Sequence, residues 1–440
     1  MMMMMMSNSD GKRDELNERL PQDVLIFHIL PFLCEWSLTD FIALSQVSKS
    51  FRALMLSKPT SSMWDIRPFN FCIDGHCCHN CKFIKGTRNT ALRVLSTYPM
   101  RRIVIHCFTD DVPIILSILS TTGNVKMLSM TLTCKRSSPS LEDLLTSTQY
   151  TEGGFSQLSE LIVDSSHLTI AAKEGRCKLL SIAGSRLTKL SFCSLSSPQI
   201  FPVIQTNCPN IVSLRVDRIQ DNSGLLQYTN PQLTELELRR CYYTFSAQLP
   251  FPLLNRLRLS YHFTLEEKQL WKVIRYTPSN LVDLTIEIPS TLFDVLIAAI
   301  TPQLTSLQRL TIEGAHDTGI MSMAAIEALG SKCRQLQYLN LDSPRSIGRL
   351  DFEDHIQSFT LFSSHYPSLS ELRLCYSESH AEGIIAMLLS SPSLRRLVLW
   401  ERFRWLDAQK RSTMLSLASS WRQLCRVEII LEDVSSACSR

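Results

Sequence analysis

The sequence predicts an α/β solenoid, a curved parallel sheet with helices on its convex side, preceded by a small all-α module of three helices. Three observations predict this fold. A short aliphatic tract recurs along most of the chain, apolar residues with helical spacing lie between the tracts, and proline precedes several tracts at a similar distance. A tract that recurs every roughly 20–50 residues indicates a stack of structural repeats.

The repeated tract has the spacing L-x-x-L-x-L, and its clearest copy runs from Leu233 to Leu238. Its second and third apolar residues are two positions apart, so on a strand both point to one side and their neighbours point to the other. Such tracts recur at steps of 21–33 residues. Thirteen candidates begin at Met100, Val125, Leu158, Leu187, Ile211, Leu233, Leu254, Leu281, Leu307, Leu336, Leu369, Leu394 and Leu424.

This pattern resembles leucine-rich repeats over about three quarters of the chain. The resemblance implies a solenoid of about 12–13 repeats over residues 99–440, in which each strand is followed by a turn, a helix and a return. Helical spacing predicts helices near residues 265–276, 292–300, 321–329, 352–362 and 383–389. Residues 67–98 are expected to be a linker or the N-terminal cap of the solenoid.

Proline supports the repeat independently of the leucines. It lies two or three residues before a tract at Pro209, Pro231, Pro278, Pro367 and Pro392. Proline cannot continue a helix, and it biases the preceding residue to extended geometry. We therefore expect each of these prolines to end a helix and to start the next strand.

Composition restricts the class of protein. Hydrophobic residues make up 45% and charged residues 20% of the 440, which suits a folded, soluble chain. The net charge of +4 is too small to predict nucleic-acid binding. Residues 1–17 are expected to be a disordered tail, and no apolar run reaches the roughly 18 residues of a membrane helix. Fifteen cysteines without an export signal indicate a reducing compartment, cytoplasmic or nuclear, and packing roles for Cys193, Cys208, Cys333 and Cys425.

Residues 18–66 differ from the repeats. Pro21 suits the first turn of a helix that is apolar on almost every side, Ser37 and Asp40 form a start like a capping box for a second, and Val47, Phe51 and Leu54 have the spacing of a third. A module of this size cannot bury so much apolar surface alone. Either these helices pack on the first repeats as a cap, or a partner protein covers them.

The same residues resemble the F-box in their order. The matching residues are Leu20-Pro21, Asp23-Val24-Leu25, Ile29-Leu30, Leu33, Asp40-Phe41, Leu44, Val47-Ser48-Lys49, Phe51-Arg52 and Trp64, with Phe51 where the family usually has Trp. The resemblance implies that the module docks on the Skp adaptor and, through it, on the cullin and RING subunits of a ubiquitin ligase. It assigns adaptor binding to Leu20, Pro21, Leu25, Ile29, Leu33, Leu44 and Val47, although some of these must form the core of the module.

A cysteine and histidine cluster lies between residues 72 and 81. Cys78 and Cys81 form a C-x-x-C pair, and His76 or His79 could add a ligand. Zinc sites usually combine two such pairs a dozen or more residues apart, and no second pair follows here. We therefore predict no metal and no cofactor, and we interpret the cluster as a linker with chance cysteines.

The positions between the leucines are mostly polar or charged, with both signs alternating along the predicted concave face. For any single charge, a solvated surface is the simpler interpretation. The functional interpretation is a protein-binding surface, since complementary charges select partners. The residues predicted to bind a protein substrate are Arg239, Arg256, Arg258, Arg373, Arg396 and Trp400. The alternative for the aromatic end is that Phe403 and Trp405 pack as a C-terminal cap.

No catalytic motif is present among the G-x-S-x-G, P-loop, H-E-x-x-H and dinucleotide-binding patterns. The sequence therefore predicts a non-catalytic adaptor that holds a substrate for ubiquitination and ubiquitin-dependent catabolism. The alternative is a leucine-rich interaction scaffold outside any ligase, whose N-terminal helices only cap the solenoid. We expect no membrane segment and no nucleic-acid partner in either case.

Overall fold

The structure is a computed structural model of the chain. The described residues are 69–72, 84–85, 92, 95–96, 101–133, 145, 154–164, 172–193, 200–217, 225, 227–241, 249–261, 267–314, 319–341, 350–352, 362, 364–375, 381–401, 416, 419 and 428–433. The predicted tail and three-helix module, the residues assigned to adaptor binding, His76 to Cys81, Phe403, Trp405 and Cys425 lie outside these ranges. The chain divides into two compact units.

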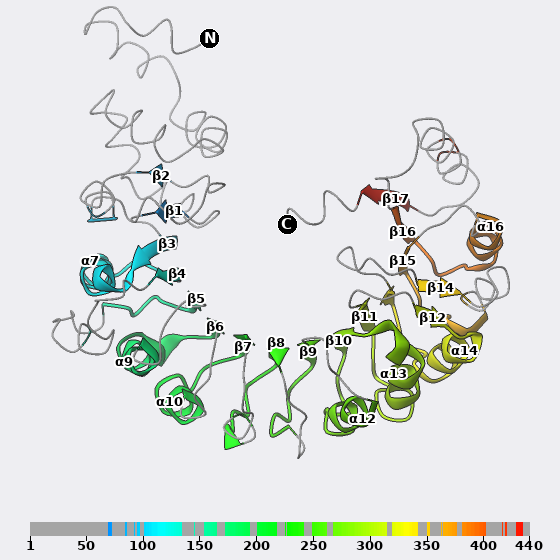
Figure 1. Ribbon diagram of the computed structural model, residues 1–440, viewed down its shortest axis with the longest axis horizontal. Coiled ribbons are helices and arrows are strands. Elements are labelled where there is room, and N and C mark those ends of the chain that lie inside the picture. The colour runs from blue at the N-terminus through cyan, green and yellow to red at the C-terminus, as the bar shows by residue number, and fades with distance from the viewer. Residues whose placement is uncertain are drawn as a thin grey trace, which may run out of the picture. The chain divides into compact units, whose positions relative to one another are not determined.

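Unit 1 comprises residues 1–194 and 203–211 and contains a parallel sheet. In spatial order its strands are β2 (Ile84–Lys85), β1 (Phe69–Cys72), β3 (Arg102–Phe108), β4 (Met127–Thr133), β5 (Glu160–Asp164) and β6 (Lys189–Cys193). The helices α7 (Val112–Thr122) and α9 (Ala172–Ala183) lie on one side of the sheet (Figure 1). Short 3-10 turns, η5 (Thr109–Asp111) and η6 (Gly184–Arg186), adjoin these helices.

Unit 2 comprises residues 195–202 and 212–440, so the boundary between the units falls within α10 (Ile200–Asn207). Its parallel sheet follows chain order through β7 (Ser213–Asp217), β8 (Glu235–Cys241), β9 (Arg256–Tyr261), β10 (Asp283–Ile288), β11 (Arg309–Gly314), β13 (Tyr338–Asn340), β15 (Glu371–Cys375), β16 (Arg396–Glu401) and β17 (Glu428–Asp433). The sheet curves, with α12 (Glu267–Arg275), α13 (Phe293–Ile300), α14 (Met323–Lys332) and α16 (Ala381–Ser390) on its convex side (Figure 1).

Twelve of the thirteen predicted tracts lead into a strand that begins two residues later, so the predicted α/β leucine-rich-repeat solenoid is confirmed. The start of the thirteenth tract, Leu424, lies outside the described residues, and β17 pairs Ile429 with Leu397, so this tract lies two residues later than predicted. Where the side chains of the aliphatic pair are described, they are buried, as Leu284 and Ile286 of β10 show. The residue that opens the tract, such as Leu281, is buried before the strand begins. The strands β1 and β2, which no tract predicted, extend the sheet of unit 1 before the first tract.

Adjacent repeats are joined in the same way at the start of each strand. The carbonyl oxygen of Thr234 accepts the backbone N–H groups of both Asn255 and Arg256, and the carbonyl oxygen of Asn255 accepts those of Val282 and Asp283. The next repeats repeat this arrangement. The shared acceptor fixes the register, because a shift by one residue would turn the buried aliphatic pair outward.

The prolines occupy a more specific place than the sequence predicted. The N–H of Leu369 donates to the carbonyl of Tyr366, and the N–H of Leu233 donates to that of Asn230, so each tract opens at the last residue of a tight turn. Pro367 and Pro231 are the second residues of these turns, the position that proline's fixed φ favours. Pro278 instead holds the first position of its turn. Most of these prolines therefore shape the return itself.

Three of the predicted helices agree closely with α12, α13 and α16, and two expectations near the C-terminal half need correction. Met321 ends a strand, β12 (Gly319–Met321), and the helix α14 begins only at Met323. Phe352 ends β14 (Leu350–Phe352), which pairs in parallel with β12 in a separate two-stranded sheet. In a short apolar run, periodicity does not distinguish a strand from a buried helix, and this explains both errors.

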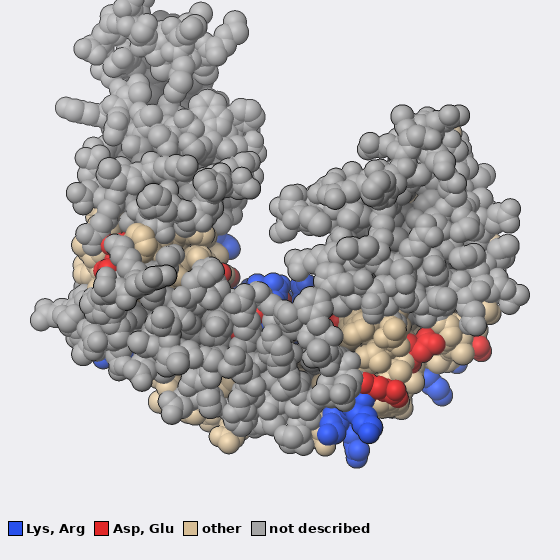
Figure 2. Space-filling model, in the orientation of Figure 1, with Lys and Arg blue, Asp and Glu red and all other residues tan. Residues whose placement is uncertain are grey.

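The outer side of α12 is basic. Lys268, Lys272 and Arg275 are exposed, whereas Leu270 and Ile274 are buried against the sheet. Figure 2 shows blue side chains at the position that Figure 1 gives to α12. This amphipathic pattern is what a helix on the solvent side of a solenoid requires.

Candidate binding face

The strands of unit 2 present their alternate side chains on the concave side, in rows that cross the sheet. We call this surface the polar face. Its first row follows the register from strand to strand and contains Ser213, Glu235, Arg256, Asp283, Arg309, Tyr338, Glu371, Arg396 and Glu428. The second row contains Arg215, Glu237, Arg258, Thr285, Thr311, Asn340, Arg373, Val398 and Ile430. A shorter third row contains Asp217, Arg239, Ser260, Glu287 and Glu313.

The first row is a ladder of alternating charge. Arg256 lies 2.8 Å from a carboxylate oxygen of Glu235 on one side and 3.2 Å from one of Asp283 on the other. Asp283 is also 3.6 Å from Arg309. Neighbouring strands place side chains close enough for such pairs to interact. Each charge of this row is thus largely balanced by its neighbours across the sheet.

Tyr338 interrupts the ladder and separates two arginines. The guanidinium carbon of Arg309 lies 4.1 Å from the centre of its ring, and that of Arg373 lies 5.5 Å away. Cations above an aromatic ring are attracted by its electron-rich face. Burial raises the pKa of the Tyr338 phenol despite the two arginines, so the ring stays neutral at physiological pH.

Beyond Tyr338, one carboxylate joins two arginines of the predicted site. Arg373 donates to Glu371 from both Nε and Nη2, each 2.8 Å from the same oxygen. Arg396 approaches that oxygen at 3.5 Å and lies 3.4 Å from Glu428. Arg373 and Arg396 therefore belong to one group.

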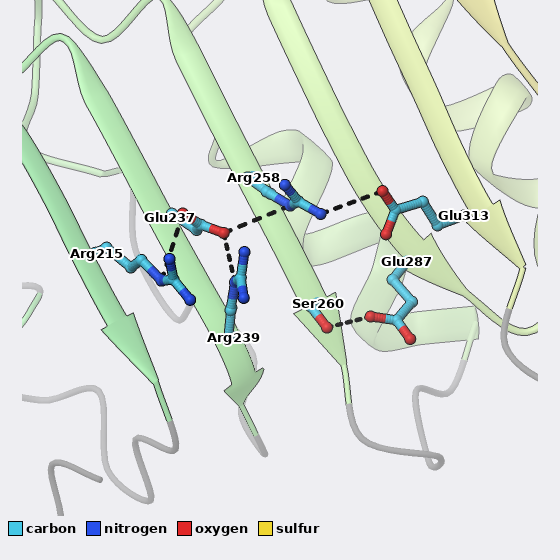
Figure 3. Close-up of polar contacts among 7 residues, drawn as sticks. All are labelled: Arg215, Glu237, Arg239, Arg258, Ser260, Glu287 and Glu313. Carbon is cyan, nitrogen blue, oxygen red and sulfur yellow. Dashed lines mark hydrogen bonds and ion pairs between the residues drawn. The ribbon is translucent and has the colours of Figure 1, made fainter. Parts of the chain in front are cut away.

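The densest group surrounds Glu237 and is shown in Figure 3. Its carboxylate contacts Arg215 at 3.6 Å, Arg258 at 3.5 Å, and the Nε of Arg239, which donates a hydrogen bond to it. We call these four residues the Glu237 cluster. The cluster spans β7, β8 and β9, and Arg258 also donates to Glu313 of β11 at 3.2 Å.

Local structure explains why these side chains meet. Arg215, Glu237 and Arg258 occupy the same position of three successive tracts, and the register therefore places them side by side. Arg239 is two residues after Glu237 on the same strand and so points to the same side. Next to the cluster, the hydroxyl of Ser260 donates a short hydrogen bond to Glu287 (Figure 3).

From β7 to β11, the arginines of the polar face are more exposed than the acids that they contact, whereas Arg396 of β16 is less exposed than its partner Glu428. Arg258 is 40% exposed and Glu313 only 23%, while Arg256 is 57% exposed and Asp283 18%. Blue side chains are visible on the inner side of the sheet near β8 and β9 in Figure 2. A partner that approaches the face between β7 and β11 therefore meets guanidinium groups before it meets carboxylates, even though opposite charges are paired.

The structure places the predicted site residues in separate groups. Arg239 and Arg258 meet at Glu237, Arg256 lies in the first row, and Arg373 and Arg396 share Glu371. Trp400 lies on β16, in register with Cys375 of β15 and Glu432 of β17, but its side chain is outside the described part of the structure. Their role in substrate binding stays a prediction.

Arg215 was missing from the predicted site, although it belongs to its densest group. The signal was present in the sequence, because Arg215 occupies the tract position of Glu237 one repeat earlier. The main chemical property of the polar face is hydrogen-bond donation from its arginines. Guanidinium groups do not deprotonate at physiological pH, but they donate paired hydrogen bonds to carboxylates and phosphates.

In the part of the chain that the structure describes, no three His, Cys, Asp or Glu side chains gather as metal ligands would. Of the sequence cluster at residues 72–81, that part includes only the backbone of Cys72. Within the same ranges, no helix has the length and apolar character to span a membrane.

Comparison with known proteins identifies no close relative. No protein-family model matches the chain, and no curated protein matches it. A solved structure of a yeast complex, that of Rad7 and Elc1, contains a chain similar to this one at 14% sequence identity. The alignment covers 89% of this chain and 99% of that one, with a TM-score of 0.40. The description of the fold therefore rests on the strands and helices themselves.

Two predicted packing cysteines, Cys208 and Cys333, are buried free thiols. Burial raises the pKa of Cys208 from 9.0 to about 12 and that of Cys333 to about 11. The thiolate is the reactive form, so at pH 8 Cys208 should alkylate roughly a thousandfold more slowly in the folded protein than in the unfolded chain. Peptide mass spectrometry after brief treatment with iodoacetamide measures this difference.

The control is the same reaction in guanidinium chloride, where both cysteines should be modified completely. Rapid modification of Cys208 or Cys333 in the folded protein would contradict their packing role and would favour a reactive or redox function.

Proposed function

We propose that this protein is the substrate-recognition subunit of an SCF-type ubiquitin ligase. Residues 18–66 dock on the Skp adaptor, which links the chain to the cullin and RING subunits, and the polar face of the solenoid holds a protein substrate for ubiquitination. The chain itself is a non-catalytic adaptor that acts in the cytoplasm, the nucleus or both. The observation that carries the ligase assignment is the order of F-box residues from Leu20 to Trp64.

Physical chemistry supports the docking module. Its predicted helices carry more large apolar residues than a unit of about 45 residues can bury by itself. Removal of a Leu, Ile or Phe side chain from water contributes roughly 1.5–3 kcal/mol. Several such anchors on a partner therefore outweigh the loss of freedom on association.

The polar face supports the substrate-binding role. It is a rigid surface of parallel strands, and its exposed groups are mainly arginines, which are enriched at protein interfaces. Repeat proteins commonly use such an extended concave surface for binding. The same face would serve the alternative function, a leucine-rich interaction scaffold outside any ligase.

Adaptor binding separates the two functions. The full-length protein should retain the Skp adaptor in a pull-down, and the double variant Leu20→Ala/Pro21→Ala should weaken that binding at least about tenfold, because it removes apolar contacts at the interface. A matched control is Arg258→Gln on the polar face, which should bind the adaptor like the wild type.

Equal retention of the adaptor by the double variant and the wild type would reject the interface assigned to the first helix. If the wild-type protein does not bind the adaptor at all, the scaffold function is favoured. Melting curves of the variants show whether any loss of binding reflects unfolding.

A further inference from the structure

We propose that the Glu237 cluster binds an anionic segment of a protein partner, whose carboxylate or phosphate groups bridge the guanidiniums of Arg215 and Arg258. The proposal deepens the proposed function, since it rests on the polar face being the substrate-binding surface. It adds Arg215 to the site and gives the chemical class of the group that is bound.

The balance of donors and acceptors carries the inference. Three guanidiniums, each with five N–H donors, contact the one carboxylate of Glu237, which offers about four acceptor positions. Glu313 adds one contact, to Arg258. The ion pairs of Arg215 and Arg258 are with Glu237 and, for Arg258, also with Glu313, so the N–H donors of these two guanidiniums outnumber the carboxylate acceptors that they contact. An incoming carboxylate or phosphate would supply further acceptors where the arginines converge.

Exposure shows which of these groups a partner can reach. Arg215 is 42% exposed and Arg258 40%, whereas Glu237 is only 22% exposed. Asp217, another acid near Arg215, is only 4% exposed and does not present its charge to solvent. The accessible part of the cluster is thus more basic than its formal charge indicates.

Crowding of like charges supports the same conclusion. The pKa of Arg215 is lowered, first by burial and then by the neighbouring charge of Arg239, while Glu237 acts in the opposite direction. The guanidinium stays protonated; Arg258 adds to the effect of Arg239, and Asp217 adds to that of Glu237. An additional anion beside Arg215 would relieve this repulsion, which favours binding.

The rest of the polar face lacks this arrangement. Arg256 lies between two acids of the neighbouring strands, Glu235 and Asp283. Arg396 likewise lies between Glu371 and Glu428. In those places arginine and acid alternate one to one. The cluster around Glu237 is the described group in which one acid contacts three arginines.

The test uses the full-length protein and two fluorescent peptides, hexaglutamate and the same peptide with one glutamate replaced by phosphoserine. Anisotropy is measured at low and at physiological ionic strength, because salt screens exposed charges. Both peptides should bind saturably. The phosphopeptide should bind more tightly, because the phosphate carries a larger negative charge than the carboxylate that it replaces. Arg215→Gln and Arg258→Gln should each weaken binding about tenfold, since each removes charge-assisted hydrogen bonds.

Two control variants make the test specific. Lys272→Gln removes an exposed positive charge from α12, on the convex side, and should change affinity by less than about twofold. Glu237→Gln removes the carboxylate that competes with the peptide, so it should tighten binding. An increase in affinity cannot result from damage to the fold, and melting curves identify any unfolded variant.

Binding of both peptides would show that carboxylates suffice, and binding of the phosphopeptide alone would identify a phosphorylated segment as the ligand. Absence of saturable binding overturns the proposal. So does an equal loss in Lys272→Gln and Arg258→Gln, which would indicate general attraction of charge, or weaker binding by a folded Glu237→Gln variant. The adaptor takes no part in this measurement, so its outcome is independent of whether the protein binds the Skp adaptor.

Discussion

Replacement of Ile286 with aspartate should unfold the repeats around β10. Ile286 is buried in the aliphatic layer, in register with Leu259 and Ile312 of the adjacent strands. The change removes a large apolar side chain and places a carboxylate where no described basic group faces it, at a cost of about 4 kcal/mol or more. The melting temperature of the affected repeats should fall by roughly 10 °C, measured by circular dichroism.

The adjacent residue provides a matched control. Thr285 lies in the second row of the polar face, between Arg258 and Thr311, and its side chain points away from the core. Thr285→Asp introduces the same residue one position away and should change stability by no more than about 0.5 kcal/mol. Similar melting curves for the two variants would show that the inward and outward sides of the strand are assigned wrongly.

Replacement of Gly330 with alanine should destabilise the protein, although alanine normally stabilises a helix. Gly330 lies in α14, where a change from glycine to alanine contributes up to about 1 kcal/mol of helix stability. A Cβ atom at this position would lie 2.6 Å from the ring of Tyr366 and 2.8 Å from the Cβ of His365. Tyr366 cannot easily move, because it is buried and its hydroxyl donates to the carbonyl of Ile326 at 2.6 Å. We expect a net loss of about 1–3 kcal/mol in urea denaturation.

A double-mutant cycle tests the cause of this loss. Most of the close contacts are with the ring of Tyr366, so in a Tyr366→Leu background the same change at Gly330 should cost much less. An equal cost in both backgrounds would mean that the ring is not the obstacle. Stabilisation of the otherwise unchanged protein by alanine would contradict the packing of α14 against the following repeat.

The repeat architecture was predictable because its signal is local and occurs thirteen times. The leucine spacing of each tract indicates which side chains of its strand face the core. The tracts also predict the register between strands, because neighbouring strands begin with the same backbone hydrogen bonds. The rows of the polar face follow from that alignment. The turn position of Pro367 could also have been derived from its place two residues before Leu369.

The contacts within the rows were less accessible to sequence reasoning. Arg258 has Glu237 on one side and Thr285 on the other, and register alone does not show that its guanidinium also reaches Glu313, two strands away. Which acids the guanidinium of Arg258 contacts depends on side-chain rotamers. The strands that end at Met321 and Phe352 were missed because a few apolar residues fit either a strand or a helix.

The alternating ladder of the first row has a consequence for how such an array can change its length. Deletion of the repeat that carries β9 would place Glu235 directly beside Asp283, and the two negative charges would repel each other across the sheet. Deletion of the repeats of both β9 and β10 would instead bring Glu235 beside Arg309, a pair of opposite sign. The aliphatic pairs of β8, β10 and β11 are alike, Leu236 and Leu238, Leu284 and Ile286, and Leu310 and Ile312, so they do not distinguish the two deletions. The polar face thus distinguishes odd from even numbers of repeats, and in this region the array should gain or lose them in pairs.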